Sequence, residues 1–283
     1  TAKKGENMEK YISKKEKASY GFAAVGSYMV AGITQSYLMY FFTDILIIPS
    51  AFVMMLMIVA RVWDALNDPM MGVIVDRTST KYGKMRPYVL VGSFLMLFTT
   101  IVLFMPLTGA PTMFKMIFAA VSYIIFGMAY TLTDVPAMGL MSVATPNSDE
   151  RASLLSFYVT VGSVGSLLPV GLLTIFQSFI PEKYVYFAMS IFVGIITSAA
   201  YLTLFKNSKE RFSTHTEKIA VRDMIKAAGK NKPMMMALLM SMAASPRYLI
   251  MPAALYIATY VINIPGLSLI HISEPTRLGM ISY

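Results

Sequence analysis

Long apolar stretches constrain this chain more than any other feature of its sequence. Seven such stretches are separated by polar segments, and each is long enough for a membrane-spanning helix, which needs about 20 residues to cross roughly 30 Å of hydrocarbon. Closed β-barrels also span membranes, but the stretches lack the alternation of apolar and polar residues found in barrel strands. We therefore expect an all-α integral membrane protein with about seven transmembrane helices. These lie at about 18–46, 52–76, 87–107, 112–144, 153–178, 183–205 and 233–263.

The composition excludes most classes of soluble protein. Hydrophobic residues make up 56% of the 283 residues and charged residues only 14%, about half the charged share of a soluble domain. This excludes a disordered chain, a coiled coil and an ordinary cytosolic enzyme. The absence of cysteine excludes disulfides, thiolate metal sites and cysteine nucleophiles. No Ser–His–Asp arrangement or phosphate-binding loop appears either, so we expect neither an enzyme nor a cofactor.

The basic residues predict how the chain is oriented. A net charge of +9 in a soluble protein would suggest a nucleic-acid partner. Here the Lys and Arg residues lie between the apolar stretches, so they indicate membrane topology and no nucleic acid. Nineteen of them fall in the segments on one side of the bilayer, against only Lys115 and Lys183 on the other. By the positive-inside rule, the N-terminus of this multi-pass cell-membrane protein is cytoplasmic.

The same pattern predicts the domain organisation. A cytoplasmic segment, 1–17, precedes a six-helix transmembrane domain over 18–205, and a basic cytoplasmic connector, 206–232, leads to one further helix at 233–263. Six spans, a basic connector and a further span suggest one half of a two-fold transporter, in which each half contains two inverted three-span repeats. We therefore expect residues 233–263 to be the first helix of a C-terminal half that is otherwise missing. Residues 268–283 change character abruptly and are interpreted as a non-native tail.

Charged residues inside two of the apolar stretches point to a function. Arg61, Asp64 and Asp68 are spaced i, i+3 and i+7, so they share one helical face, and Asp134 lies in the fourth stretch. Each such residue costs roughly 2.5–3.5 kcal/mol on insertion scales, so it persists only with a partner or a function. Three carboxylates against one Arg predict a cluster that binds cations, binds protons or faces a watery cavity.

Two prolines support a cation site among these acids. Pro69 and Pro136 lack an N–H group, and each frees a backbone carbonyl within a turn of a buried Asp. Discontinuous helices of transporters coordinate cations with such carbonyls. The alternative is a satisfied structural salt bridge between Arg61 and the acids. The side chains expected to bind a sodium-sized ion are Asp64, Asn67, Asp68 and Thr131.

The turn after the second stretch, residues 72–87, combines glycines, one acid and several basic residues. Asp76 can receive the positive end of a neighbouring helix or pair with Arg. With Arg61, Arg77 and Arg86 it is expected to form a charge network that gates the cytoplasmic side. The alternative is a solvated basic loop that only sets topology.

Residues 61–87 closely resemble the signature of the glycoside–pentoside–hexuronide:cation symporters, the melibiose permease group of the major facilitator superfamily. Further segments resemble other parts of this family, and together they cover about residues 11–265. The resemblance implies a twelve-span fold and co-transport of a glycoside or related solute with Na⁺, Li⁺ or H⁺. The segments outside the signature are 17–22, 40–44, 130–136 and 149–151.

The resemblance also implies roles for single residues. It assigns the cation site to the four side chains named above, and the substrate site to Asp134 and Tyr130. Where the family has a sugar-binding acid, a stacking Trp and an Arg, this chain has Tyr28, Met138 and, nearby, Tyr158. The tyrosines could hydrogen-bond sugar hydroxyls.

Other assignments stay open at the level of the sequence. Arg247, in the seventh stretch, could face the cavity and bind substrate, snorkel to the membrane surface or pair with an acid. The altered sugar-site positions would equally suit a cation-coupled lysolipid carrier. A non-transporting membrane sensor or scaffold is the alternative from another class of function.

Overall fold

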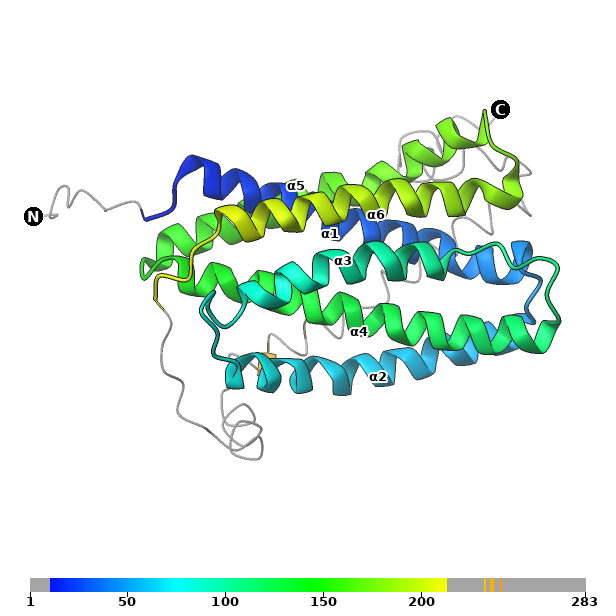
Figure 1. Cartoon of the computed structure of the whole chain (residues 1–283), viewed down its shortest axis with the longest axis horizontal. Coiled ribbons are helices and arrows are strands. Elements are labelled where there is room, and N and C mark those ends of the chain that lie inside the picture. Colours follow the sequence, from blue (N-terminus) through cyan, green and yellow to red (C-terminus); the bar gives the residue numbers. More distant parts are fainter. Residues whose placement is uncertain (1–10, 213–231, 233–234, 237–239, 241–283) are drawn as a thin grey trace, which may run out of the picture.

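The computed structural model describes residues 11–212, 232, 235–236 and 240. Six long helices run side by side along the molecule (Figure 1). A five-residue π-helix, η1 (Phe41–Ile45), continues the first of them. The long helices are α1 (Lys14–Tyr40), α2 (Ser50–Arg77), α3 (Arg86–Leu103), α4 (Thr112–Ala144), α5 (Ser148–Gln177) and α6 (Glu182–Asn207).

These helices match the first six predicted stretches to within about five residues. The fifth begins earlier than predicted because the Asn147 side chain accepts hydrogen bonds from the first backbone N–H groups of α5. The third ends earlier, at Leu103, where a turn containing Pro106 follows. Nearly all of the seventh stretch, 233–263, lies outside the described residues. So do the connector beyond residue 212, apart from residue 232, and all of the tail 268–283.

The prediction of an all-α membrane protein is confirmed. Among the described residues, five helices, α2 to α6, are long and apolar enough to cross a membrane. The first helix falls short of this measure because polar residues such as Ser27, Thr34 and Gln35 interrupt it. It packs against α5 and α6, and 15 of its 27 residues are buried.

The surface of the bundle is apolar where a bilayer would surround it. Large side chains such as Phe98, Ile117 and Leu167 are each more than half exposed. A soluble monomer rarely leaves so much apolar surface in water, whereas lipid tails solvate it. The arrangement is that of a multi-pass membrane protein.

Small residues set the spacing between α1 and α5. A side-chain carbon added at Gly165 would lie 2.7 Å from the carbonyl oxygen of Val25, and one added at Gly32 would lie 2.7 Å from that of Ser166. Close approach of this kind is the usual basis of helix packing in membranes. By contrast, α2 packs chiefly against α4 and lies at the edge of the bundle (Figure 1). One face of α2 is therefore left open.

The segment after α6 fastens one end of the bundle, which we call the N-terminal end because α1 begins there. Arg211 forms a two-pronged ion pair with Glu16, with nitrogen–oxygen distances of 2.7 and 2.9 Å. Hydrogen bonding to the Glu16 carboxylate raises the pKa of the Arg211 guanidinium. The backbone N–H groups of Arg211 and Phe212 donate to the carbonyl of Val143 in α4. Three helices are thereby joined at this end.

Glu210 makes a second attachment at the same end. Its carboxylate accepts hydrogen bonds from the backbone N–H groups of Lys84, Met85 and Arg86, at 2.8, 2.8 and 3.0 Å. No local side chain caps α3. The first backbone N–H groups of a helix need an acceptor, and here Glu210 supplies it from a distant part of the chain.

Candidate functional site

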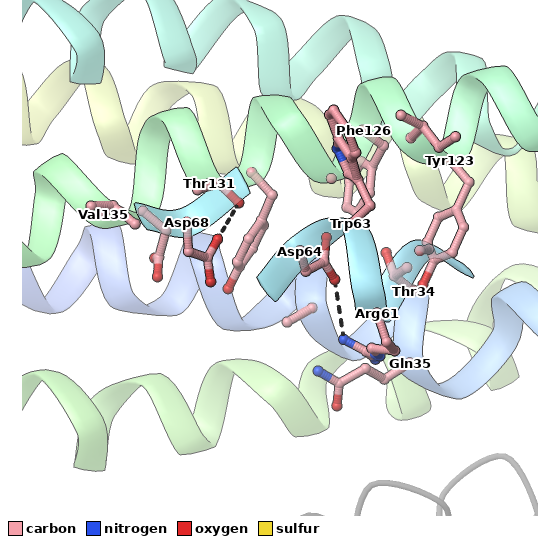
Figure 2. Close-up of a pocket in the computed structure, with 16 residues that line it drawn as sticks. Thr34, Gln35, Arg61, Trp63, Asp64, Asp68, Tyr123, Phe126, Thr131 and Val135 are labelled. Atoms are coloured by element: carbon pink, nitrogen blue, oxygen red, sulfur yellow. Dashed lines mark hydrogen bonds and ion pairs between the residues drawn. The ribbon is translucent and has the colours of Figure 1, made fainter. Parts of the chain in front are cut away.

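A cavity of about 290 Å³ lies between α1, α2 and α4. Figure 2 shows side chains from these helices converging on it. The open face of α2 forms one wall, and among the described elements α2 packs chiefly against α4. Six of the residues singled out in the sequence line the cavity, namely Arg61, Asp64, Asp68, Tyr130, Thr131 and Asp134.

The two acids of α2 have different partners. An Asp64 oxygen lies 3.6 Å from a guanidinium nitrogen of Arg61, whose side chain is 66% exposed. The Thr131 hydroxyl donates a hydrogen bond to an Asp68 oxygen at 2.9 Å. The predicted helical face is therefore observed, since Arg61, Asp64 and Asp68 line one cavity. The Arg61 pair offsets one carboxylate and leaves Asp68 with a neutral partner.

Asn67 lies in the same helix but is not among the residues that line the cavity. Its side chain is 4% exposed, and its amide nitrogen has no hydrogen-bond partner within the described part of the chain. Both α2 and α4 remain continuous helices through Pro69 and Pro136. Among the described residues, no group of three acidic or imidazole side chains is arranged to hold a metal ion. A cation here would need neutral oxygens besides the two carboxylates.

Asp134 is the point at which three helices meet. The Ser27 hydroxyl of α1 donates to its carboxylate at 2.8 Å, and the Tyr201 hydroxyl of α6 donates at 3.4 Å. The oxygen of Ser27 also lies 3.2 Å from that of Tyr130. Sequence reasoning missed Ser27 and Tyr201. A serine or a tyrosine in an apolar stretch carries no signal of its own, although Ser27 adjoins a position that the family resemblance singles out.

Two other predicted substrate residues, Tyr28 and Tyr158, do not line the cavity, although Tyr158 lies next to Asp134 and Tyr130. The rings of Tyr28 and Tyr158 pack edge to face, with centroids 6.3 Å apart, between α1 and α5. Met138, which is 40% exposed on α4, does not line the cavity either. Arg247 lies outside the described residues.

Four cavity residues with hydrogen-bonding side chains were not predicted from the sequence: Thr34, Gln35, Trp63 and Tyr123. Trp63 directly precedes Asp64 in the sequence, so its position beside a candidate site residue could have identified it. Its indole nitrogen is buried without a hydrogen-bond partner within the described residues. Thr34 donates to the carbonyl of Val30 in its own helix.

The predicted gating residues do not come together as one network. Asp76 and Arg77 are exposed at the end of α2 and make no ion pair within the part of the chain that is described. Arg86 instead binds α6, where it donates to the carbonyl of Phe205 at 2.7 Å and lies 4.9 Å from the centre of the Phe205 ring. Arg61 lies in the cavity.

Comparison with known proteins agrees with this arrangement. Residues 19–273 match the family of MFS/sugar transport proteins. An uncharacterized symporter of Bacillus subtilis, YjmB, is 32% identical over 261 residues, covering 89% of this chain and 56% of the relative. The putative glycoside/cation symporter YagG of Escherichia coli is 28% identical, with 91% and 57% covered. The isoprimeverose transporter of Lactiplantibacillus pentosus is 29% identical, with 77% and 47% covered.

The chain thus spans about half the length of the relatives that it matches. The matched region includes every helix that lines the cavity. These relatives are named as symporters or transporters and not as enzymes. With the helical fold and the acids of α2 and α4, these matches show that the chain belongs to the glycoside–pentoside–hexuronide:cation symporter family of MFS/sugar transport proteins.

Proposed function

We propose that this chain carries the ion-binding and solute-binding residues of a symporter that couples entry of Na⁺, Li⁺ or H⁺ to uptake of a glycoside. One observation carries the proposal: the acids of α2 and the acid of α4 line a single cavity. A cation and a solute bound there would lie close enough for each to alter the affinity of the other. The coupling ion is then the one inorganic partner required.

The proposed cation site comprises Asp64, Asp68, Asn67 and Thr131. The hydrogen bond between Thr131 and Asp68 supports it because it brings a hydroxyl and a carboxylate oxygen together from two helices. Two carboxylates one turn apart repel each other in a medium of low dielectric constant, and a bound cation offsets that repulsion. Arg61 supplies part of the offset when the cation is absent.

The proposed solute site is centred on Asp134 and Tyr130. Ser27 and Tyr201 hold the Asp134 carboxylate in place, and a carboxylate with spare lone pairs accepts hydrogen bonds from sugar hydroxyls. Tyr28 and Tyr158 lie behind this group, where they would shape it without lining the cavity. A role for Arg247 in substrate binding remains a proposal.

We also propose the orientation and the moving parts. The protein lies in the cell membrane. Its N-terminus and the N-terminal end of the bundle face the cytoplasm, as the positive-inside rule predicts. Alternating access of the two-half kind requires a second bundle that rocks against this one. Asp76, Arg77 and Arg86 are the proposed contacts with that second bundle on the cytoplasmic side.

Substitutions of Asp68 and Asp134 test ion binding and solute binding separately. Asp68→Asn keeps the volume and removes one charge, so we expect it to abolish the stimulation of glycoside binding by Na⁺ while leaving Na⁺-independent binding. Asp134→Asn should weaken glycoside binding and leave Na⁺ binding largely intact. Calorimetric titration of the chain in lipid nanodiscs measures both. If Asp68→Asn leaves the Na⁺ effect intact, the α2 acids form a structural salt bridge and the assigned cation site is wrong.

A further inference from the structure

One end of the cavity carries two polar side chains that the proposed function does not use, together with Arg61. Gln35, on α1, is exposed there and makes no side-chain hydrogen bond within the described residues. Tyr123, on α4, and the largely exposed guanidinium of Arg61, on α2, line the same region. Figure 2 places Gln35 and Tyr123 at the opposite end of the cavity from Asp68. We call these three residues the outer cluster.

The outer cluster is too far from Asp134 for one sugar ring to reach both. Tyr123 and Asp134 lie in the same continuous helix, eleven residues apart, which corresponds to roughly 16 Å along the axis. A single pyranose ring held at Asp134 and Tyr130 therefore leaves the outer cluster uncovered. Asp64 lies between Asp68 and the outer cluster (Figure 2).

The chemistry of the outer cluster suits a neutral, hydroxyl-bearing group. The Gln35 amide and the Tyr123 hydroxyl both donate and accept hydrogen bonds, and the Arg61 guanidinium donates. The Arg61 charge is already offset by Asp64 at 3.6 Å, so no anionic substrate group is needed to balance it. Sugar hydroxyls, which also donate and accept, match this set.

We propose that Gln35, Tyr123 and Arg61 form an outer subsite that binds the hydroxyls of the second ring of a glycoside. This inference rests on the proposed function, in which the first ring lies at Asp134 and Tyr130. The outer subsite determines specificity: it favours two-ring glycosides over their single-ring components. A two-ring glycoside that reaches from Asp134 to the outer cluster would also pass Asp64, which lines the same cavity.

The chain supplies its own reporter for the test. Trp63 is its single tryptophan and lines the cavity, so intrinsic fluorescence follows occupation of the cavity. The protein is reconstituted in lipid nanodiscs free of maltoside detergent and titrated in NaCl with maltose, melibiose and xylobiose, and with glucose, galactose and xylose. Calorimetry of the same titrations gives affinities that do not depend on the fluorophore.

We expect at least one two-ring sugar to bind at least about five-fold more tightly than its single-ring components, since each added hydrogen bond contributes roughly two- to ten-fold. Gln35→Leu and Tyr123→Phe should each weaken that binding by a similar factor and leave single-ring binding unchanged. Thr203→Val is the matched control, because its hydroxyl bonds only the carbonyl of Ala199 in α6. Gln35→Asn, which keeps an amide on a shorter side chain, is a second variant in case the leucine variant misfolds. Its unfolding temperature should be unchanged.

Three results would overturn the inference, and they are distinguishable. Equal affinity for one-ring and two-ring sugars, or equal weakening of both by Gln35→Leu, removes the outer subsite and leaves the proposed function standing. Tighter binding of glucuronate that depends on Arg61 would show that the subsite reads an anion. Failure of every sugar to bind, with no Na⁺ effect that depends on Asp68, would remove the proposed function as well.

Discussion

Removal of the Glu210 carboxylate should loosen the start of α3. This carboxylate accepts three backbone hydrogen bonds at 2.8–3.0 Å from residues 84–86. The next residue, Pro87, has no N–H group, and α3 has no local side-chain cap. A change to alanine therefore leaves three adjacent donors without their acceptor.

The expected cost follows from those contacts. A hydrogen bond to a charged group contributes about 1.5–3 kcal/mol, but Glu210 is only partly buried and water can replace part of what is lost. We therefore expect Glu210→Ala to lower the free energy of unfolding by about 2–4 kcal/mol. For a chain of this size that is a fall in Tm on the order of 5–10 °C. Glu210→Gln, which keeps one acceptor, should fall between.

Two measurements check this prediction. Thermal unfolding in nanodiscs gives the Tm, and hydrogen exchange should show faster exchange, at least about ten-fold, at the amides of residues 84–86. Asp149→Asn is the control, because Asp149 is exposed and its carboxylate makes no tertiary hydrogen bond within the described residues. Equal Tm values for the Glu210→Ala and Asp149→Asn variants, with unchanged exchange at residues 84–86, would refute the reasoning.

Three further predictions concern packing, the cavity and topology. Gly165→Val should cost about 3 kcal/mol or more in unfolding free energy, because the added carbon meets the backbone of α1 at 2.7 Å, whereas Gly171→Val, with nothing within 4 Å, should cost little. Gly127→Leu should place a side chain in the cavity and abolish sugar binding measured by calorimetry without lowering the Tm; retained binding would contradict the assigned site. Single cysteines in this cysteine-free background should be labelled by an impermeant maleimide from outside the cell at position 179 and not at Lys81, and the opposite pattern would reverse the proposed orientation.

Much of the fold was predictable because the bilayer imposes a simple requirement on length and polarity. The fourth apolar stretch was expected at 112–144, and α4 has those bounds. Helical periodicity likewise placed Arg61, Asp64 and Asp68 on one face, and all three line the cavity. Both predictions depend only on residues close together in the sequence, for which helix geometry is sufficient.

The resemblance to a known family supplied what periodicity could not. It pointed to Tyr130, and it assigned to Asp134, already singled out by its charge inside an apolar stretch, a role in the substrate site. It also suggested Tyr28 and Tyr158 for the substrate site; neither lines the cavity, although Tyr158 lies next to Asp134. A matched motif position identifies a residue but does not determine which way its side chain faces.

The sequence by itself determined the six helices, the polar face of α2 and the family, because each is encoded in residues within a few helical turns. Only the tertiary structure decided that Ser27 and Tyr201 hold Asp134 and that Glu210 caps α3. These partners are separated by 67 to 126 residues along the chain. Their meeting depends on which helices become neighbours. Close contacts at small residues such as Gly165 set that order, and no local pattern of apolar residues records it.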